Sequence, residues 1–178
     1  MSDIHTPFPT VPSLLANPLR LVPLAPLAQA LTVLARRLVA RHPGLISRLG
    51  PYVHSSFAIA PTDLPVTLLL HPHPTAMRIT LHRDPPKADA RIAGPLSALL
   101  GLVHGTWDGD ALFFSRDLVI DGDTSAALAL RNAIDDCELD LGAEIAGLSG
   151  PFGRLLMPFI DFAERRTGMP LRRAEGRP

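Results

Sequence analysis

The stretch "FFSRDLVIDGDTSAALALRNAID", residues 113–135, decides the fold because three local signals follow one another in it. "DLVIDG" (117–122) has the composition of a short strand, and its Asp-Gly pair favours a tight corner. Asp123 is a good N-cap for a helix predicted over Thr124–Cys137. The inner face of that helix is predicted to consist of Ala127, Leu130, Ile134 and Cys137. The stretch thus specifies a strand, a corner and a helix, and it contains no catalytic signature.

Four segments upstream have the character of β-strands. They are "FAIA" (57–60), "VTLLL" (66–70), "MRITLHR" (77–83) and "ADARIA" (88–93). The third alternates strictly between apolar and polar residues, which is typical of a half-buried antiparallel strand. Because the strands cluster instead of alternating with helices, the sequence predicts an α+β fold. We expect a mainly antiparallel sheet of about five strands packed with helices.

Two further helices are predicted from apolar residues that recur every three or four positions. The first runs from Pro26 to about His42, where Pro43-Gly44 is expected to end it, and its apolar stripe is Leu27, Leu31, Leu34 and Leu38. The second follows Gly94-Pro95 and carries Leu96, Leu99, Leu100 and Val103 on one face. A C-terminal amphipathic segment begins near Pro151, and Pro158 is expected to kink it.

These elements suggest three parts. Residues 1–50 are predicted to form a Pro-rich extended arm followed by an amphipathic helix. Residues 51–138 are predicted to form the central domain, and residues 139–178 a C-terminal helical tail.

The composition is apolar for a chain without a membrane span. Of the 178 residues, 47% are hydrophobic and 19% are charged, and the mean hydropathy is +0.21. Even so, the uninterrupted apolar runs are shorter than the ~18 residues that a membrane span needs. The excess apolar surface is therefore expected to be buried in the core, against a partner or around an apolar ligand.

The charge balance and the N-terminus limit the classes of partner and the cellular location that we expect. The formal net charge is +0, which argues against a nucleic-acid partner. The single cysteine, Cys137, excludes an internal disulfide. The N-terminus "MSDIHTPFPTVPS" does not have the basic region of a secretory signal, so we expect a cytoplasmic protein, with a peripheral position at the inner membrane as an open alternative.

Residues of the types that could bind a metal or act in catalysis are scattered along the sequence rather than clustered. His71 and His73 share a strand face and are favoured as solvent-facing residues, because no third metal ligand is evident nearby. The Asp-Gly-Asp triplets at 108–110 and 121–123 are typical of turns and do not continue with the spacing of a calcium loop. Ser115, Ser149 and Cys137 do not lie in a nucleophile motif. The sequence therefore predicts no catalytic residue, no metal and no cofactor.

The residues from "LFFSRDLVIDGD" into the following helix resemble the sterol carrier protein 2 domain family, and the likeness extends over residues 57–134. Within that family, "LFF", "R.L.I.GDT" and "AL...N.ID" resemble bacterial accessory factors of oxygen-independent ubiquinone biosynthesis. The resemblance implies a non-enzymatic protein that binds an isoprenoid quinone precursor and presents it to iron–sulfur hydroxylases. It implies lipid-binding residues on the predicted pocket walls, for which we expect Leu99, Leu100, Val103, Phe113, Phe114, Ile120, Leu130 and Ile134.

Two other interpretations stay open. The same fold with a filled core would act as a non-catalytic scaffold for partner proteins. An enzyme would need convergent polar groups such as His71, His73 and His104, and the sequence places its polar residues mostly on turns and outer faces. Arg36, Arg37 and Arg41 on the first helix suit either a solvated face or contact with an anionic membrane or a partner.

Overall fold

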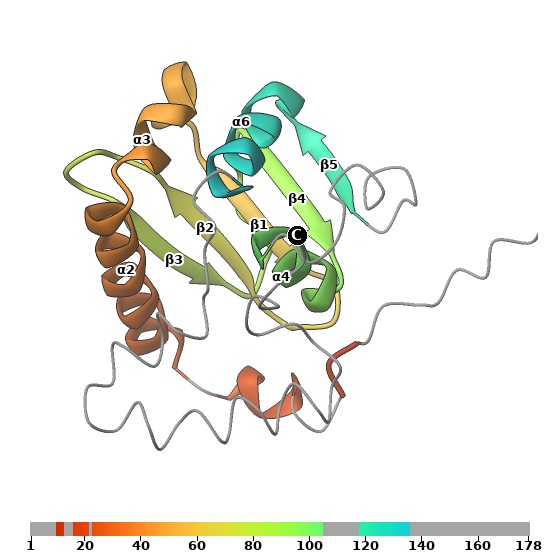
Figure 1. The fold of residues 1–178 in the computed structure, drawn as a ribbon. Coiled ribbons are helices and arrows are strands. Elements are labelled where there is room, and N and C mark those ends of the chain that lie inside the picture. The colour runs from red at the N-terminus through yellow and green to blue at the C-terminus, as the bar shows by residue number, and fades with distance from the viewer. Residues whose placement is uncertain (1–9, 13–15, 22, 105–117, 136–178) are drawn as a thin grey trace, which may run out of the picture.

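The fold is built on one five-stranded sheet with helices on one face (Figure 1). The computed structural model describes residues 10–12, 16–21, 23–104 and 118–135. The strand order is β3-β2-β1-β4-β5. The strands are β1 (Phe57–Pro61), β2 (Thr67–His71), β3 (Arg78–His82), β4 (Ala90–Gly94) and β5 (Val119–Gly122). The predicted α+β class is confirmed, and each strand lies within one residue of a segment read from the sequence or inside it.

The sheet is mixed, although most of its pairings are antiparallel. The pairs β1–β2, β2–β3 and β4–β5 are antiparallel, whereas β1 and β4 are parallel. After β3 the chain crosses over to the free side of β1, so β4 enters in the same direction as β1 (Figure 1). This crossover places β4 and β5 beside the first hairpin and gives the helices one continuous sheet face to cover.

The helices match those predicted from the sequence only in part. They are α2 (Leu24–Arg41), α3 (Gly44–Leu49), α4 (Leu96–His104) and α6 (Thr124–Asp135), with 3₁₀ turns at Asn17–Arg20 and Gly50–His54. Pro43-Gly44 ends α2 as predicted, but the chain then resumes as the unpredicted α3. A proline in the first turn of a helix loses no hydrogen bond, so the same dipeptide that stops α2 allows α3 to start. The extended arm expected before the predicted helix start at Pro26 instead includes the turn at Asn17–Arg20 and the start of α2.

The core lies between the sheet and α3, α4 and α6. Phe57 and Ala90 are fully buried partners on the parallel pair β1–β4, and they face the same side of the sheet. Ala126 and Ala127 of α6 are buried against that side, and so is Ala98 of α4. These small side chains allow the two helices to approach the strands closely, which positions the longer apolar residues between them.

The corner between β5 and α6 forms as the sequence predicts. Asp123 caps α6, because its Oδ1 accepts hydrogen bonds from the backbone N–H groups of Ser125 (2.9 Å) and Ala126 (3.0 Å). The preceding Gly122 has a φ of +82°, a conformation that glycine adopts at little cost. The predicted inner face of α6 is confirmed at Ala127 and Leu130, which are buried, whereas Ile134 is half-buried and Cys137 lies outside the described residues.

Helix α2 covers the outer edge of the sheet at β3 (Figure 1). The Thr32 hydroxyl accepts a hydrogen bond from the N–H of Ile79 and lies 3.0 Å from the carbonyl oxygen of Ile79, to which it can donate. The Arg36 Nε donates to the carbonyl oxygen of Met77 at 2.9 Å. Edge strands expose unpaired backbone groups, and these two side chains satisfy several of them. They also fix the position of α2 relative to the sheet.

Candidate functional site

An apolar cavity of about 220 Å³ lies between the sheet and the helices α2, α3 and α6. Its lining residues are Ala35, Leu38, Val39, Leu45, Ile46, Leu49, Leu68, Leu70, Pro72, Met77, Ile79, Leu130, Ala133 and Ile134. All of these described residues have apolar side chains, so the described part of the wall offers neither a hydrogen-bonding side chain nor a charge. An empty cavity with such walls stays dry and binds apolar molecules.

Strand alternation builds the floor of the cavity. Leu70 pairs with Ile79 across the β2–β3 hairpin, and Leu68 lies two residues before Leu70 on the same face. Because successive side chains of a strand point to opposite faces, these three side chains all face the helices. Met77, just before β3, is buried at the same end of the floor.

Three helices form the other walls, each through one apolar stripe. Leu38 of α2 is buried, and its neighbours one turn away line the same cavity. Leu49 of α3 and Leu130 of α6 are buried as well, and α3 packs directly against α6. The loop of only two residues between α2 and α3 holds these helices at an angle, and the cavity lies in the space between them.

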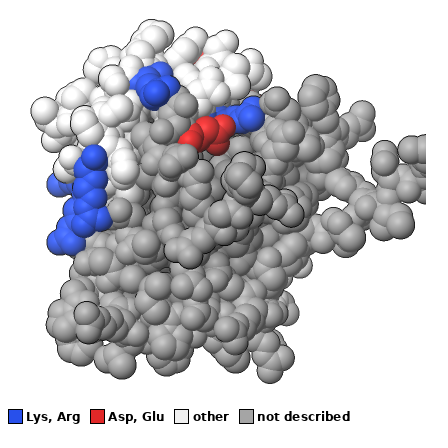
Figure 2. All heavy atoms as spheres, viewed as in Figure 1, with Lys and Arg blue, Asp and Glu red and all other residues white. Residues whose placement is uncertain are grey.

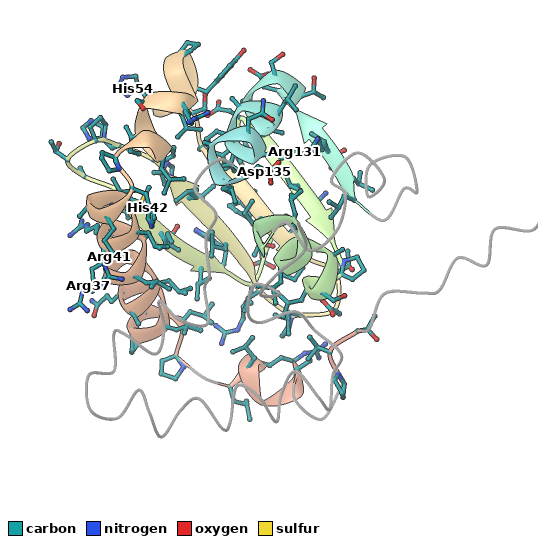
Figure 3. The ribbon with its side chains drawn as sticks, viewed as in Figure 1. Arg37, Arg41, His42, His54, Arg131 and Asp135 are labelled. Atoms are coloured by element: carbon teal, nitrogen blue, oxygen red, sulfur yellow. The ribbon has the colours of Figure 1, made fainter. Side chains whose placement is uncertain are left out.

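The charged residues of this region lie on the outside of the helices. Arg37 and Arg41 point away from the sheet on the outer side of α2, and Arg131 and Asp135 lie together on α6 (Figure 3). Arg131 Nε lies 3.3 Å from a carboxylate oxygen of Asp135, an ion pair one helical turn apart. In the space-filling view, the described surface of this face is mostly uncharged, with basic side chains at the edge formed by α2 (Figure 2).

The structure brings two of the residues predicted to bind lipid into the cavity wall, namely Leu130 and Ile134. Leu99 is buried in the core beneath α4, and Ile120 packs against that core from β5. Leu100 is half-buried on α4. None of these last three is among the described residues that line the cavity. The side chain of Val103, and Phe113 and Phe114 entirely, lie outside the described residues.

Sequence reasoning did not assign the lining residues of α2, α3, β2 and β3. The signal for part of them was available, because Leu38 belongs to the predicted stripe of the first helix and Ile79 to the alternating strand. Nothing local in the sequence distinguishes a side chain that faces a cavity from one that packs in a filled core. The contribution of α3 was missed because that helix itself was not predicted.

The scattered polar residues do not form a second site among the described residues. His71 is exposed at the end of β2, and the rings of His54 and His73 lie 5.8 Å apart. Within the part of the chain that the structure describes, no group of three possible metal ligands comes together. Asp121 pairs with Arg91 across β4 and β5 at 2.7 Å. The triplet at 108–110, both candidate serines, Cys137 and the side chain of His104 lie outside the described residues.

Asp89 is the one described residue whose titration is clearly shifted, and its role is structural. Its Oδ2 accepts hydrogen bonds from the backbone N–H and the hydroxyl of Ser56, both at 2.7 Å. These two bonds lower the pKa of Asp89 below its ordinary value of 3.8, the backbone bond most strongly. The carboxylate ties the start of β4 to the residue before β1 and does not line the cavity.

Among residues 10–12, 16–21, 23–104 and 118–135, the structure has no helix long and apolar enough to span a membrane.

Comparison with known proteins gives a family match and a fold match. The model of the SCP-2 sterol transfer family matches residues 37–135, more than half of the 178-residue chain. The solved structure described as "UbiJ-SCP2 Ubiquinone synthesis protein" has a TM-score of 0.53 at 19% identity. It covers 67% of this chain and 98% of its own, which shows a shared fold.

Among curated proteins, the ubiquinone biosynthesis accessory factor UbiT of Escherichia coli (strain K12) is 33% identical over 78 residues. UbiT of Escherichia coli O157:H7 matches with the same identity over the same length. The matched region covers 44% of this chain and 41% of these relatives, so it spans less than half the length of either protein.

Proposed function

This chain belongs to the SCP-2 sterol transfer family, and from that premise we propose that it is a non-catalytic lipid-binding accessory protein of ubiquinone biosynthesis. In this proposal it binds isoprenoid quinone precursors and presents them to hydroxylases of an oxygen-independent pathway. The similarity to UbiT supports the pathway, and the cavity supports the ligand class.

The observation that carries the proposal is the chemistry of the cavity wall. Its described lining is entirely apolar, and its volume is about 220 Å³. Binding there depends on removing apolar surface from water, which contributes about 0.8 kcal/mol for each methylene buried. A polyprenyl chain satisfies this requirement, since it is a continuous hydrocarbon that has no hydrogen bonds to lose.

A carrier of this kind needs no acid, base or nucleophile at the ligand. The described cavity lining includes no titratable side chain. The redox chemistry would then come from the partner proteins, which we propose to be the iron–sulfur hydroxylases of the quinone pathway. No cofactor of its own enters this proposal.

The surface of α2 suits the collection of such a ligand from a membrane. Leu27 and Val33 expose 36% and 47% of their surface on this helix, and Arg36, Arg37 and Arg41 are exposed on it. Exposed apolar and basic side chains on one helix are typical of contact with anionic lipid headgroups. We therefore propose a protein of the cytoplasm that touches the inner membrane peripherally.

Organic extraction of the purified full chain, followed by mass spectrometry, tests the proposal. We expect a prenylated phenol or quinone in stoichiometric amount. A mixture of phospholipids would leave the lipid-binding part standing and contradict the quinone pathway. A protein that comes out empty and takes up no added isoprenoid quinone would instead favour the scaffold interpretation, in which the same fold acts by docking partner proteins.

A further inference from the structure

A second and larger hollow lies on the outer side of the cavity, in the groove between α2 and the edge strand β3. Its volume is about 660 Å³, three times the 220 Å³ of the cavity. Leu24, Ala28 and Val33 line it from α2, and Ile79 and Leu81 line it from β3.

The groove adjoins the cavity. Ile79 lines both hollows. Leu68, which lines the cavity, pairs directly with Leu81, which lines the groove, so two neighbouring positions of the β2–β3 hairpin lead from one hollow to the other. On α2, Ala35 lines the cavity and Ala28 lines the groove, and seven residues along a helix make about two turns.

The volume of the cavity limits the length of chain that it can enclose. At roughly 30 Å³ for each water-sized heavy atom, a cavity of 220 Å³ holds about seven heavy atoms. An isoprene unit has five carbon atoms, so the cavity accommodates between one and two units. The remainder of a longer chain must leave the cavity and needs another apolar surface.

Polar side chains also line the groove, namely Gln29, Thr32, Arg36, Arg78 and Thr80, and three of these, Thr32, Arg36 and Thr80, are hydrogen-bonded within the protein. The Thr32 hydroxyl is hydrogen-bonded to the backbone of Ile79, and Arg36 Nε donates to the carbonyl oxygen of Met77. These side chains therefore present mainly their aliphatic parts to the groove, as long basic side chains often do over apolar surface. The other six described lining residues are apolar, and Gln29 and Arg78 are exposed, so a hydrocarbon chain can lie along the apolar part of the groove.

We propose that the groove between α2 and β3 binds the distal units of a long isoprenoid chain whose first units fill the cavity. This inference rests on the proposed function, and it makes the protein selective for chain length. A ligand with one isoprene unit uses the cavity alone, whereas a longer chain also contacts the groove.

Three tryptophan substitutions on α2 of the full-length protein test this inference. Ala28→Trp fills the groove, Ala35→Trp fills the cavity, and Ala40→Trp is the matched control, because Ala40 is exposed and lines neither hollow. Each protein is mixed with phosphatidylcholine vesicles that contain ubiquinone with either one or six isoprene units. The vesicles are then removed, and mass spectrometry quantifies the quinone held by the protein.

We expect Ala28→Trp to reduce capture of the long-chain quinone by about tenfold, a loss of 1.4 kcal/mol, with the short-chain quinone unchanged. Ala35→Trp should lose both quinones, and Ala40→Trp neither. Equal effects of Ala28→Trp on the two chain lengths, or no effect on either, would contradict the proposal that the groove binds the distal units. A wild-type protein that captures neither quinone would instead refute the proposed function.

Ala25→Trp provides a second groove variant in case Ala28→Trp unfolds, because Ala25 lines the groove and is exposed, so a larger side chain is tolerated there. It should reproduce the selective loss of the long chain. If it leaves long-chain capture intact while the protein is folded, the groove is occupied by something else, such as residues 139–178 of this chain or a partner protein.

Discussion

Gly122 lies so close to the backbone of Asp89 that a side chain on Gly122 would collide with the Asp89 carbonyl oxygen. That oxygen accepts a hydrogen bond from the N–H of Asp123 at 2.8 Å. The corner between β5 and α6 is therefore fixed to the start of β4. Since α6 supplies Leu130, Ala133 and Ile134 to the cavity, this contact sets the position of one cavity wall.

Gly122→Ala should destabilise the protein strongly, because it adds a collision with the Asp89 backbone to an unfavourable positive φ. We expect a loss of about 2–4 kcal/mol in the free energy of unfolding, measured by urea denaturation. Gly44→Ala is the matched control, because a Cβ at Gly44 meets nothing within 4 Å. A Gly122→Ala protein as stable as the control would show that the corner does not need glycine.

The hydrogen bonds that Ser56 donates to Asp89 should make stability depend on pH. Because the pKa of Asp89 is lowered in the folded protein, its contribution is complete above 3.8 and is lost as the pH falls below that value. The carboxylate is exposed, so we expect less than about 1 kcal/mol. Asp89→Asn should flatten this part of the pH–stability curve between about pH 5 and pH 2.

An NMR titration of the Asp89 carboxyl gives an independent reading of the same interaction. Ser56→Ala removes the hydroxyl donor and keeps the backbone donor, so the pKa of Asp89 should rise part of the way towards 3.8. If it does not change in Ser56→Ala, the hydroxyl has no part in the shift.

Thr32→Val should loosen α2 from the sheet edge. Valine has nearly the shape of threonine but cannot accept from the Ile79 N–H or donate to the carbonyl oxygens of Ala28 and Ile79, between which the hydroxyl lies, so we expect a cost of about 1–2 kcal/mol. Hydrogen exchange at the Ile79 amide should become faster, while Thr32→Ser, which keeps the hydroxyl, should retain the protection. If the exchange rate of the Ile79 amide is unchanged in a folded Thr32→Val protein, the Thr32 hydroxyl does not protect this edge of the sheet.

Ile134→Asp should empty the cavity, because a carboxylate in an apolar wall is costly to bury and attracts water. We expect the lipid that co-purifies to fall by about tenfold, which corresponds to a loss of about 1.4 kcal/mol. Leu128→Asp on the same helix is the control, because Leu128 exposes 49% of its surface and does not line the cavity. Circular dichroism confirms that both variants fold, and equal lipid content in the two would argue against this cavity.

The candidate site was predictable only where one element contributes a complete stripe. Leu130 and Ile134 are neighbours on the inner face of α6, and the period of that helix alone assigns them. Leu99 obeys the same rule on α4 but is packed in the core, because α4 lies over a different part of the sheet. The spacing of apolar residues along a helix thus distinguishes buried positions from exposed ones. It does not distinguish a position in the packed core from one that lines a cavity.

The amino-acid sequence by itself determined the strands, the N-cap at Asp123, the glycine corner and the apolar stripes of α2, α4 and α6, because each depends on residues close together in the chain. The tertiary structure alone decided the parallel pairing of β1 with β4 and the seating of α2 against the edge of β3. It also decided that side chains from α2, α3, α6 and the β2–β3 hairpin leave a hollow among them. Those outcomes depend on contacts between residues far apart in the chain, whose geometry is set only when the helices pack on the sheet.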